Sequence, residues 1–196
     1  MMTLLDEFRD LRPAGGFDLI MADPPWSYQM YSAEGYRRAP EAHYQTMSLA
    51  DICALPAEAL AAQDCLLWLW AVGPQLPQAL KVMESWGFAF KTSGHWAKVG
   101  LSGKQAFGTG YLLRCAGEPF LIGTRGAPRT TRVVRSVLMA PAREHSRKPA
   151  IAFSEAVRLM PDARRIELFS RERRDGWSTW GDETGTFGAG KFGAAE

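Results

Sequence analysis

The stretch Phe17-Asp18-Leu19-Ile20-Met21-Ala22-Asp23-Pro24-Pro25-Trp26 decides how the rest of the chain is interpreted. Its first six residues are mostly apolar, which is typical of a short β-strand. The strand must end at the double proline, because neither proline can donate to a sheet and each fixes its φ near −65°. The turn therefore presents a carboxylate, two carbonyls and an indole at the carboxyl end of a strand, where open α/β sheets bind ligands. An Asp-Pro pair can also simply end a strand, so the turn alone does not establish a function.

The composition is that of one globular domain. Of the 196 residues, 46% are hydrophobic and 22% are charged. We expect a single domain over residues 1–184 and a flexible Gly/Ala-rich tail over residues 185–196. No apolar run reaches the ~20 residues that span a bilayer, and the acidic N-terminus does not resemble a signal peptide. The three widely spaced cysteines, Cys53, Cys65 and Cys115, favour a reducing cytoplasm over a disulfide framework or a zinc site.

Charge is distributed unevenly along the chain. Residues 1–64 carry ten acids against four arginines, although the whole chain has a net charge of +2. The segment 125–148 is the most basic, with Glu144 as its only acid against Arg125, Arg129, Arg132, Arg135, Arg143, Arg147 and Lys148. Such clustering suits a phosphate backbone, and a solvated basic face is the alternative explanation.

Alternating strand and helix patterns predict an α/β fold with a largely parallel sheet. Strands are expected at 17–22, 65–71, 88–98, 119–124, 136–139 and 165–170, and helices at 4–11, 48–61, 73–85 and 149–160. The run 65–71 is apolar throughout, as in a parallel strand buried on both faces, so we expect Trp68 and Trp70 in the core. Loops are expected at 27–47, 99–116 and 171–183, and the tyrosines of the first favour a functional loop.

The turn at 23–26 suits the methylation of an amine. The exocyclic amine of adenine is a poor nucleophile, because its lone pair is delocalised into the ring. Asp23 and the Pro24 carbonyl can each accept one N–H of that amine, which localises the lone pair toward an electrophile. The doubled proline keeps the carbonyl aimed before the substrate arrives. Trp26 or a nearby tyrosine can stack on the base, and S-adenosylmethionine is the matching methyl donor.

Further stretches resemble the MT-A70-like family of N6-adenine methyltransferases. In the family's order they are DPPW at 23–26, YQTMS at 44–48, LWLW at 67–70, GEP at 117–119, REHSRKP at 143–149, IELFSR at 166–171 and WSTWGD at 177–182. Each stretch is weak alone, and the ordered set, which covers roughly residues 17–183, is specific. The resemblance implies a Rossmann-like methyltransferase fold in permuted order, with the catalytic turn N-terminal and the cofactor strand C-terminal. It implies Asp23, Pro24, Pro25 and Trp26 as catalytic residues.

The resemblance also implies a site for S-adenosylmethionine. Glu167 is expected to accept both ribose hydroxyls, and Lys148 to pair with the methionine carboxylate. The full expected set is Asp23, Lys148, Glu167, Phe169, Arg171, Arg174, Gly181, Asp182 and Glu183. The chain departs from the family at Glu172-Arg173-Arg174, where small polar residues are common, and at Asp182-Glu183, where amides are frequent. Without the resemblance, a surface pair between Glu167 and Arg171 is the simpler explanation.

The implied substrate is adenine in a nucleic acid, with DNA favoured over RNA. A base inside a duplex cannot reach the turn, so the enzyme must use single strands or flip the adenine out. The loops 27–47 and 125–148 are the expected clamps, and the expected contacts are Trp26, Tyr28, Tyr44, Arg125, Arg129, Arg143, His145 and Arg147. As a loop histidine, His145 is otherwise simply solvated.

The chain has little room for a separate sequence-reading domain. Either the basic loop reads a short motif, or a second subunit, as a homodimer or a related partner, supplies part of the nucleic-acid surface. Three other functions stay open: an RNA N6-adenosine methyltransferase, a nucleic-acid-binding subunit without activity, and a methyltransferase for another amine such as cytosine N4.

Overall fold

The computed structural model describes residues 2–27, 46–100, 102–110, 112–143 and 147–181. Its strands form one sheet in the order β5-β3-β4-β2-β1-β6-β7. The strands are β1 (Phe17–Ala22), β2 (Ala61–Trp70), β3 (Ala89–Lys98), β4 (Gly117–Arg125), β5 (Val137–Ala140), β6 (Arg165–Leu168) and β7 (Ser178–Trp180). The helices are α1 (Leu4–Leu11), α3 (Leu49–Ala54), α4 (Leu76–Ser85) and α5 (Ala150–Leu159), with 3-10 turns η2 (Ala57–Ala59) and η3 (Gly73–Gln75).

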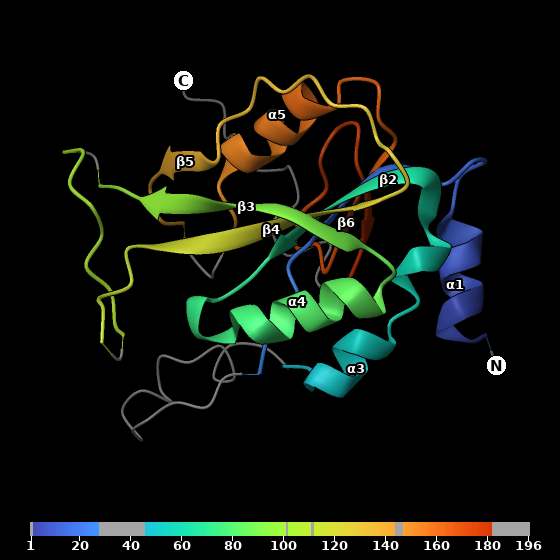
Figure 1. The fold of residues 1–196 in the computed structure, drawn as a ribbon, viewed down its shortest axis with the longest axis horizontal. Coiled ribbons are helices and arrows are strands. Elements are labelled where there is room, and N and C mark those ends of the chain that lie inside the picture. Colours follow the sequence, from blue (N-terminus) through green and yellow to red (C-terminus); the bar gives the residue numbers. More distant parts are fainter. Residues whose placement is uncertain (1, 28–45, 101, 111, 144–146, 182–196) are drawn as a thin grey trace, which may run out of the picture.

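Helices cover both faces of the sheet, with α3 and α4 on one side and α5 on the other (Figure 1). Successive strand residues point to opposite faces, so each strand supplies both cores. On the first face, Ile20 and Leu67 pack in one buried cluster with Val82 of α4. On the second face, Trp68 packs in another with Phe153 of α5. The predicted burial of the apolar run in β2 is confirmed, because Trp68 and Trp70 are each only 1% exposed.

One reversed strand distinguishes the sheet from a fully parallel one. β1 is parallel to β2 and β6, and β3 is parallel to β5, whereas β4 runs antiparallel to both β2 and β3. The expected α/β fold with a mostly parallel sheet is confirmed. Because of these directions, one side of the sheet holds the ends of β1, β2, β3, β5 and β6 and the start of β4. We call this side the carboxyl edge. The opposite side is the amino edge.

Local sequence signals account for most of the element boundaries. The helix at Leu4–Leu11 and the strand at Phe17–Ala22 lie where they were predicted. Ser48 is the N-cap of α3, since its hydroxyl accepts the backbone N–H of Asp51 at 3.1 Å. The prediction that 171–183 is only an exit loop is wrong, because β7 lies within it and pairs with β6. α1 packs against β7, with the Phe8 and Trp180 ring centroids 4.9 Å apart.

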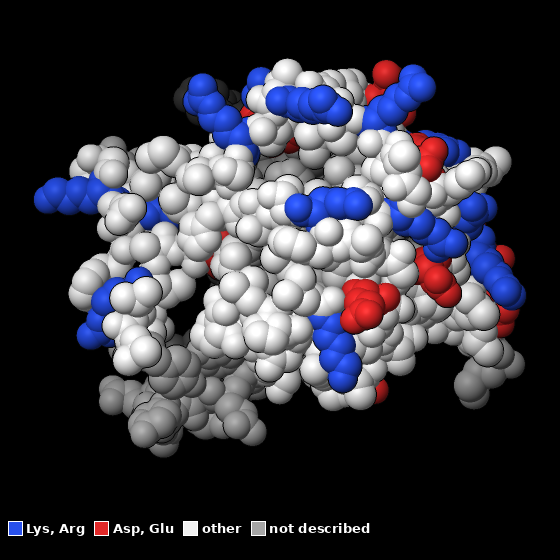
Figure 2. Space-filling view, in the orientation of Figure 1, with Lys and Arg blue, Asp and Glu red and all other residues white. Residues whose placement is uncertain are grey.

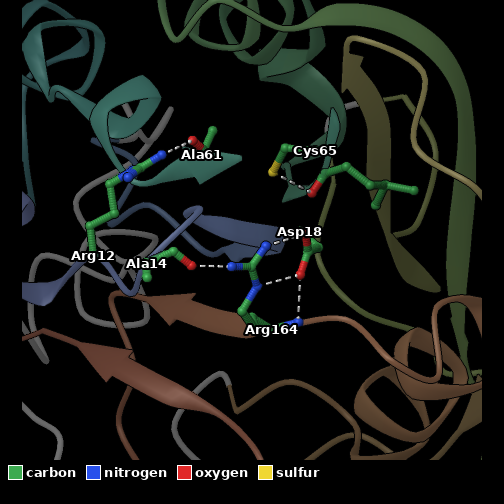
Figure 3. Close-up of polar contacts among 7 residues, drawn as sticks. Arg12, Ala14, Asp18, Ala61, Cys65 and Arg164 are labelled. Carbon is green, nitrogen blue, oxygen red and sulfur yellow. Dashed lines mark hydrogen bonds and ion pairs between the residues drawn. The ribbon is translucent and has the colours of Figure 1, made fainter. Parts of the chain in front are cut away.

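The amino edge is closed by one arginine (Figure 3). Arg164 donates from Nε and Nη2 to the two carboxylate oxygens of Asp18, both at 2.8 Å, and also donates to the Ala14 carbonyl. Gly15 has φ +82°, a backbone conformation that glycine adopts without the strain that a Cβ would add. These contacts tie the start of β1 to the start of β6. The hydrogen bonds from Arg164 hold the pKa of Asp18 below its usual value.

The longest described helices, α4 and α5, have ten residues each, and no helix in this part of the chain could cross a membrane. The tail expected at 185–196 and most of the loop expected at 27–47 lie outside the described residues.

Candidate active site

The turn after β1 is held at both of its proline carbonyls. The Trp26 N–H donates to the Pro24 carbonyl at 2.8 Å, and the Met47 N–H donates to the Pro25 carbonyl at 2.9 Å. Asp23 leaves the sheet directly beside the end of β6, since its N–H lies 3.5 Å from the Leu168 carbonyl. The carboxylate is thus fixed at the carboxyl edge by backbone contacts on each side of it.

Trp26 is part of the core. Its side chain is 7% exposed, and its indole N–H donates to the Trp70 carbonyl at 3.2 Å. This placement does not fit the expected stacking of Trp26 on a base, because a buried ring offers no open face. The ring instead anchors the turn on β2, and its apolar burial stabilises the position of Asp23.

Asp23 belongs to a chain of alternating charges. Lys148 Nζ lies 2.6 Å from Asp23 Oδ2 and 3.1 Å from Glu118 Oε2, and Lys98 Nζ lies 2.6 Å from Glu118 Oε1. Lys148 comes from the segment after β5, and Glu118 from the second residue of β4. The reversed direction of β4 therefore brings an acid to the carboxyl edge, where it shares Lys148 with Asp23.

Burial and charge oppose each other in this chain. Burial raises the pKa of Asp23, and the nearby ammonium of Lys148 offsets only part of that rise. For Glu118 burial acts in the same direction, but Lys148 and Lys98 outweigh it, so its pKa lies below the usual value. Burial would lower the pKa of Lys148, and the two carboxylates outweigh it and raise that pKa. Lys148 is therefore a permanent cation between two acids.

Glu167 is a buried acid beside Asp23. It lies in β6, opposite Met21 of β1, and is 8% exposed. Burial raises its pKa to about 7, although a hydrogen bond from Ser170 Oγ at 2.8 Å and the charge of Arg174 act against the rise. This environment does not fit a simple surface pair of Glu167 with Arg171. A carboxyl group with so high a pKa has too few hydrogen-bond donors and cations around it to offset its burial. Such a group in a surface hollow is a candidate for binding a ligand.

The chain leaves β6 through an unusual backbone. Phe169 has φ +61°, which costs a non-glycine residue about 1 kcal/mol. The Ser170 N–H then donates to the Trp180 carbonyl at 3.0 Å. A Cβ on Gly181 would lie 2.8 Å from Ser170 N, so only glycine allows the two segments to approach this closely. The strained turn aims Phe169 and the following arginines back over the carboxyl edge.

A second ionic cluster lies on the other side of Glu167. Glu172 is 7% exposed and forms ion pairs with Arg147 and Arg174. The Arg174 guanidinium lies 3.6 Å from the centroid of the Phe153 ring. Arg143 donates to the Lys148 carbonyl at 3.2 Å. Glu172 thus joins the segment before α5 to the segment after β6.

These residues surround one hollow in the protein surface. It is lined by Asp23, Arg147, Lys148, Phe153, Glu167, Phe169, Arg171, Glu172 and Arg174. The structure therefore brings together six of the nine residues expected to bind the cofactor, with Gly181 packed behind them. Sequence reasoning assigned no role to Glu118, Ser170 or Glu172. Glu118 had a signal, since it stands in the GEP stretch directly before a strand.

Arg125 and Arg129 do not belong to this site. Arg125 ends β4, seven residues beyond Glu118, which is about 24 Å along a strand. It lies opposite Cys65, near the amino edge, and its Nη1 lies 3.7 Å from Glu58 Oε2. Thr131, two residues after Arg129, donates to the Arg158 carbonyl at the far end of α5. The structure thus brings only the C-terminal end of the segment 125–148 to the hollow, because β5 carries the chain across the sheet between its two halves. Substrate contacts by Arg125 and Arg129 stay a prediction.

Five expected site residues, Tyr28, Tyr44, His145, Asp182 and Glu183, lie outside the described residues. Within the described part of the chain, no group of three or more His, Cys, Asp or Glu side chains is placed to hold a metal ion.

The donor set suits S-adenosylmethionine. Lys148 and Arg171 offer positive charge for a carboxylate, Glu167 offers an acceptor for ribose hydroxyls, and Phe169 offers a ring for an adenine. The close approach of Gly181 leaves the exit of β6 without a bulky neighbour. The residues present therefore fit the group.

An open sheet with a charged hollow at its carboxyl edge, and an acid at the ends of two neighbouring parallel strands, defines a Rossmann-like methyltransferase. The chain belongs to the MT-A70 family, whose profile matches residues 17–183. The resemblance drawn from the sequence is thereby confirmed.

Named relatives agree with the family. The chain is similar to the type II methyltransferase M.MunI of a Mycoplasma species, at 31% identity over 91% of this chain and 82% of that protein. It is 29% identical to the human N(6)-adenine-specific methyltransferase METTL4, over 85% of this chain and 37% of METTL4. It is also 29% identical to the N6-methyladenosine RNA methyltransferase MTA1 of Pyricularia oryzae, over 88% of this chain and 48% of MTA1. The chain thus spans half or less of the last two proteins.

Proposed function

We propose that this protein transfers a methyl group from S-adenosylmethionine to the N6 amine of adenine in nucleic acid, with DNA as the favoured polymer, through a single domain over residues 1–184. The observation that carries the proposal is the meeting of Asp23, Lys148 and Glu167 in one hollow of an MT-A70 chain. A carboxylate for the acceptor amine and a carboxylate for the donor's ribose then lie on adjacent strands, β1 and β6.

Asp23 and the Pro24 carbonyl form the acceptor half of the proposed site. Each can accept one N–H of the adenine amine, and together they localise the nitrogen lone pair toward the hollow. Lys148 holds Oδ2 of Asp23 at 2.6 Å, which fixes the direction of the carboxylate before a base arrives. The Pro24 carbonyl accepts one N–H from Trp26 and keeps a second lone pair for the substrate.

Glu167, Lys148 and Arg171 form the donor half. When bound, S-adenosylmethionine supplies an electrophilic methyl group on a sulfonium. The ionised Glu167 would accept hydrogen bonds from the ribose hydroxyls, and the two cations would orient the carboxylate of the donor. Because the pKa of Glu167 is about 7, the strong-accepting ionised form predominates only above neutrality. Binding of the donor then stabilises the ionised form and lowers that pKa.

DNA is favoured because the chain matches a larger share of the type II methyltransferase than of the RNA methyltransferase. It covers most of a compact type II methyltransferase, and less than half of the relative whose name specifies RNA. RNA is the second candidate substrate. A homodimer or a related partner subunit would complete the nucleic-acid surface.

The test combines donor binding with methyl transfer. Calorimetry should show uptake of S-adenosylmethionine by the wild type at pH 7.5, and uptake at least tenfold weaker for Glu167→Gln. Glu84→Gln, an exposed acid on α4, is the matched control and should bind as the wild type does. Labelled donor offered with DNA and RNA oligonucleotide pools should label one of them. A folded wild type that takes up no donor and labels neither polymer contradicts the proposal.

A further inference from the structure

The segment 99–116, which we call the finger, joins the end of β3 to the start of β4 at the carboxyl edge. It projects beyond the tip of β3 at the left of the molecule (Figure 1). Its base is fixed by backbone hydrogen bonds, from the Ala106 N–H to the Lys98 carbonyl and from the Lys98 N–H to the Ala116 carbonyl, both at 2.8 Å. A β-bridge between Val99 and Gln105 adds to this. The base of the finger is therefore held to the sheet by regular backbone hydrogen bonds.

Backbone hydrogen bonds tie together the two sides of the finger near its tip. The Gly108 N–H donates to the Cys115 carbonyl at 2.9 Å, and the Cys115 N–H donates to the Thr109 carbonyl at 3.0 Å. Gly110 allows the turn to close, because a Cβ there would lie 1.9 Å from the Leu113 carbonyl oxygen. These contacts hold a backbone that presents Leu112 and its neighbour to solvent.

The side chains at the tip are large and apolar. Leu112 is 98% exposed, Leu113 is 85% exposed, and Phe107 is 81% exposed. They bury almost no surface, so packing within the domain does not explain them. Three such side chains on one projection indicate a contact with another molecule.

The charge of the finger is entirely positive. Lys104 and Arg114 are exposed, and there is no aspartate or glutamate between residues 99 and 116. The Arg114 guanidinium lies 5.2 Å from the centroid of the Phe107 ring. In Figure 2, basic side chains lie at this end of the molecule without a large acidic patch beside them, whereas at the opposite end basic and acidic side chains are mixed. Cations interleaved with exposed apolar side chains match a polyanion with stackable bases.

The finger is also connected to the candidate active site. Glu118 follows it directly and contacts both Lys98, at the finger's other end, and Lys148. Lys148 in turn contacts Asp23. The base of the finger is thus two ion pairs away from the carboxylate that is proposed to hold the adenine.

From these observations we propose that the finger contacts the nucleic-acid substrate beside the target adenine. Phe107, Leu112 and Leu113 pack on or between bases, and Lys104 and Arg114 contact phosphates. This inference rests on the proposed function, because it assigns a surface to the same substrate. An apolar contact next to the target fills the space that a displaced adenine leaves.

The test compares Leu112→Ser/Leu113→Ser with the wild type and with Leu80→Ser. Leu80 is a half-exposed leucine of α4, on the helical face of the domain, and serves as the matched control. Fluorescence anisotropy measures binding of a labelled 30-base-pair random-sequence duplex and of a 20-nucleotide single strand. Calorimetry measures S-adenosylmethionine binding, and light scattering after size exclusion measures the mass of each variant. Since both leucines are exposed, thermal unfolding of the finger variant should match that of the wild type.

The expected result is binding about tenfold weaker to at least one polymer for the finger variant, with donor binding and mass unchanged. Lys104→Gln/Arg114→Gln should lower the slope of log K against log salt by about 1 to 2. Unchanged affinity for both polymers overturns the inference. So does a wild-type dimer that the leucine substitutions convert to a monomer, because the finger would then bind a second copy of the chain. If the wild type binds no S-adenosylmethionine, the proposed function is contradicted. The anisotropy measurements would then still show whether the finger binds nucleic acid.

Discussion

β1 carries one aspartate near each end, and the two have opposite surroundings. Asp18 at the amino edge meets Arg164 in a two-pronged ion pair, and its pKa is lowered by those hydrogen bonds. Asp23 at the carboxyl edge shares Lys148 with Glu118, and burial raises its pKa. An aspartate at the start of β1 is thus stabilised in its ionised form, whereas the aspartate directly after the end of β1 is held where burial disfavours that form.

The difference extends to β6, the neighbour of β1. Arg164 before this strand closes the amino edge, whereas Glu167 in it is a buried acid with a pKa of about 7. Ion pairs at the amino edge hold the sheet together. Acids at the carboxyl edge cost stability because they are kept in a form and a place that a ligand can use.

The largest expected effect separates the two aspartates by activity. Asp23→Asn keeps the shape of the side chain but removes the negative charge that accepts the N–H hydrogen bond of the amine, and should lower kcat about 10³-fold. Initial rates of label transfer from S-adenosylmethionine to an unmethylated oligonucleotide pool measure this. Activity within threefold of the wild type would show that Asp23 does not act on the amine.

Removal of Lys148 should disturb the carboxyl edge more than any change at the amino edge. Lys148→Met leaves two partly buried acids without their shared, buried cation, which should cost about 3 kcal/mol of unfolding free energy. Urea titration at pH 7.5 measures the loss. Lys98→Met is the control, because it removes only the more exposed end of the chain of charges and should cost about 1 kcal/mol. Equal losses of unfolding free energy in the two variants would show that Lys148 does not stabilise the acids more than Lys98 does.

Glu167 makes the stability of the protein fall as pH rises. Its folded pKa of about 7 exceeds the ordinary value of 4.5, so the folded state holds a proton that the unfolded state has lost between these pH values. Between pH 5 and pH 8 the wild type should therefore lose about 2.5 kcal/mol more than Glu167→Gln. Unfolding at both pH values, without donor, measures the difference. Parallel losses in the two proteins would place Glu167 in an ordinary environment.

The smallest effect is expected at the amino edge. Asp18→Asn should cost about 1 kcal/mol at pH 7, because it weakens a partly exposed pair, and should leave methyl transfer within twofold. The lowered pKa means that this contribution is present above about pH 4 and is lost as the pH falls below it. Urea titrations at pH 7 and pH 3 test both statements. A large loss of activity would remove the contrast between the edges.

The helices and strands were easier to predict from the sequence than the contacts between segments that lie far apart in it. β1 and α1 have local signals strong enough to fix their ends, and the ordered motifs predicted that Asp23, Lys148 and Glu167 meet. β7 was missed because its three residues lie among polar neighbours and owe their strand geometry to pairing with β6.

Long-range register explains the remaining errors. Arg125 and Lys148 share one basic segment of sequence, but β5 and the reversed β4 carry them to opposite edges of the sheet. Trp26 has the residue type of a stacking surface, and only the distance to the Trp70 carbonyl reveals it as a core residue. Glu118 enters the site because β4 runs against its neighbours, a direction that composition does not encode.

The identity of the methylated nucleoside tests the central claim most directly. DNA and RNA pools are incubated with the wild type and S-adenosylmethionine, digested to nucleosides and analysed by mass spectrometry. We expect N6-methyl-2′-deoxyadenosine from the DNA pool, and its loss with Asp23→Asn but not with Asp18→Asn. N4-methylcytosine as the product, or equal yields from the two aspartate variants, would contradict the account.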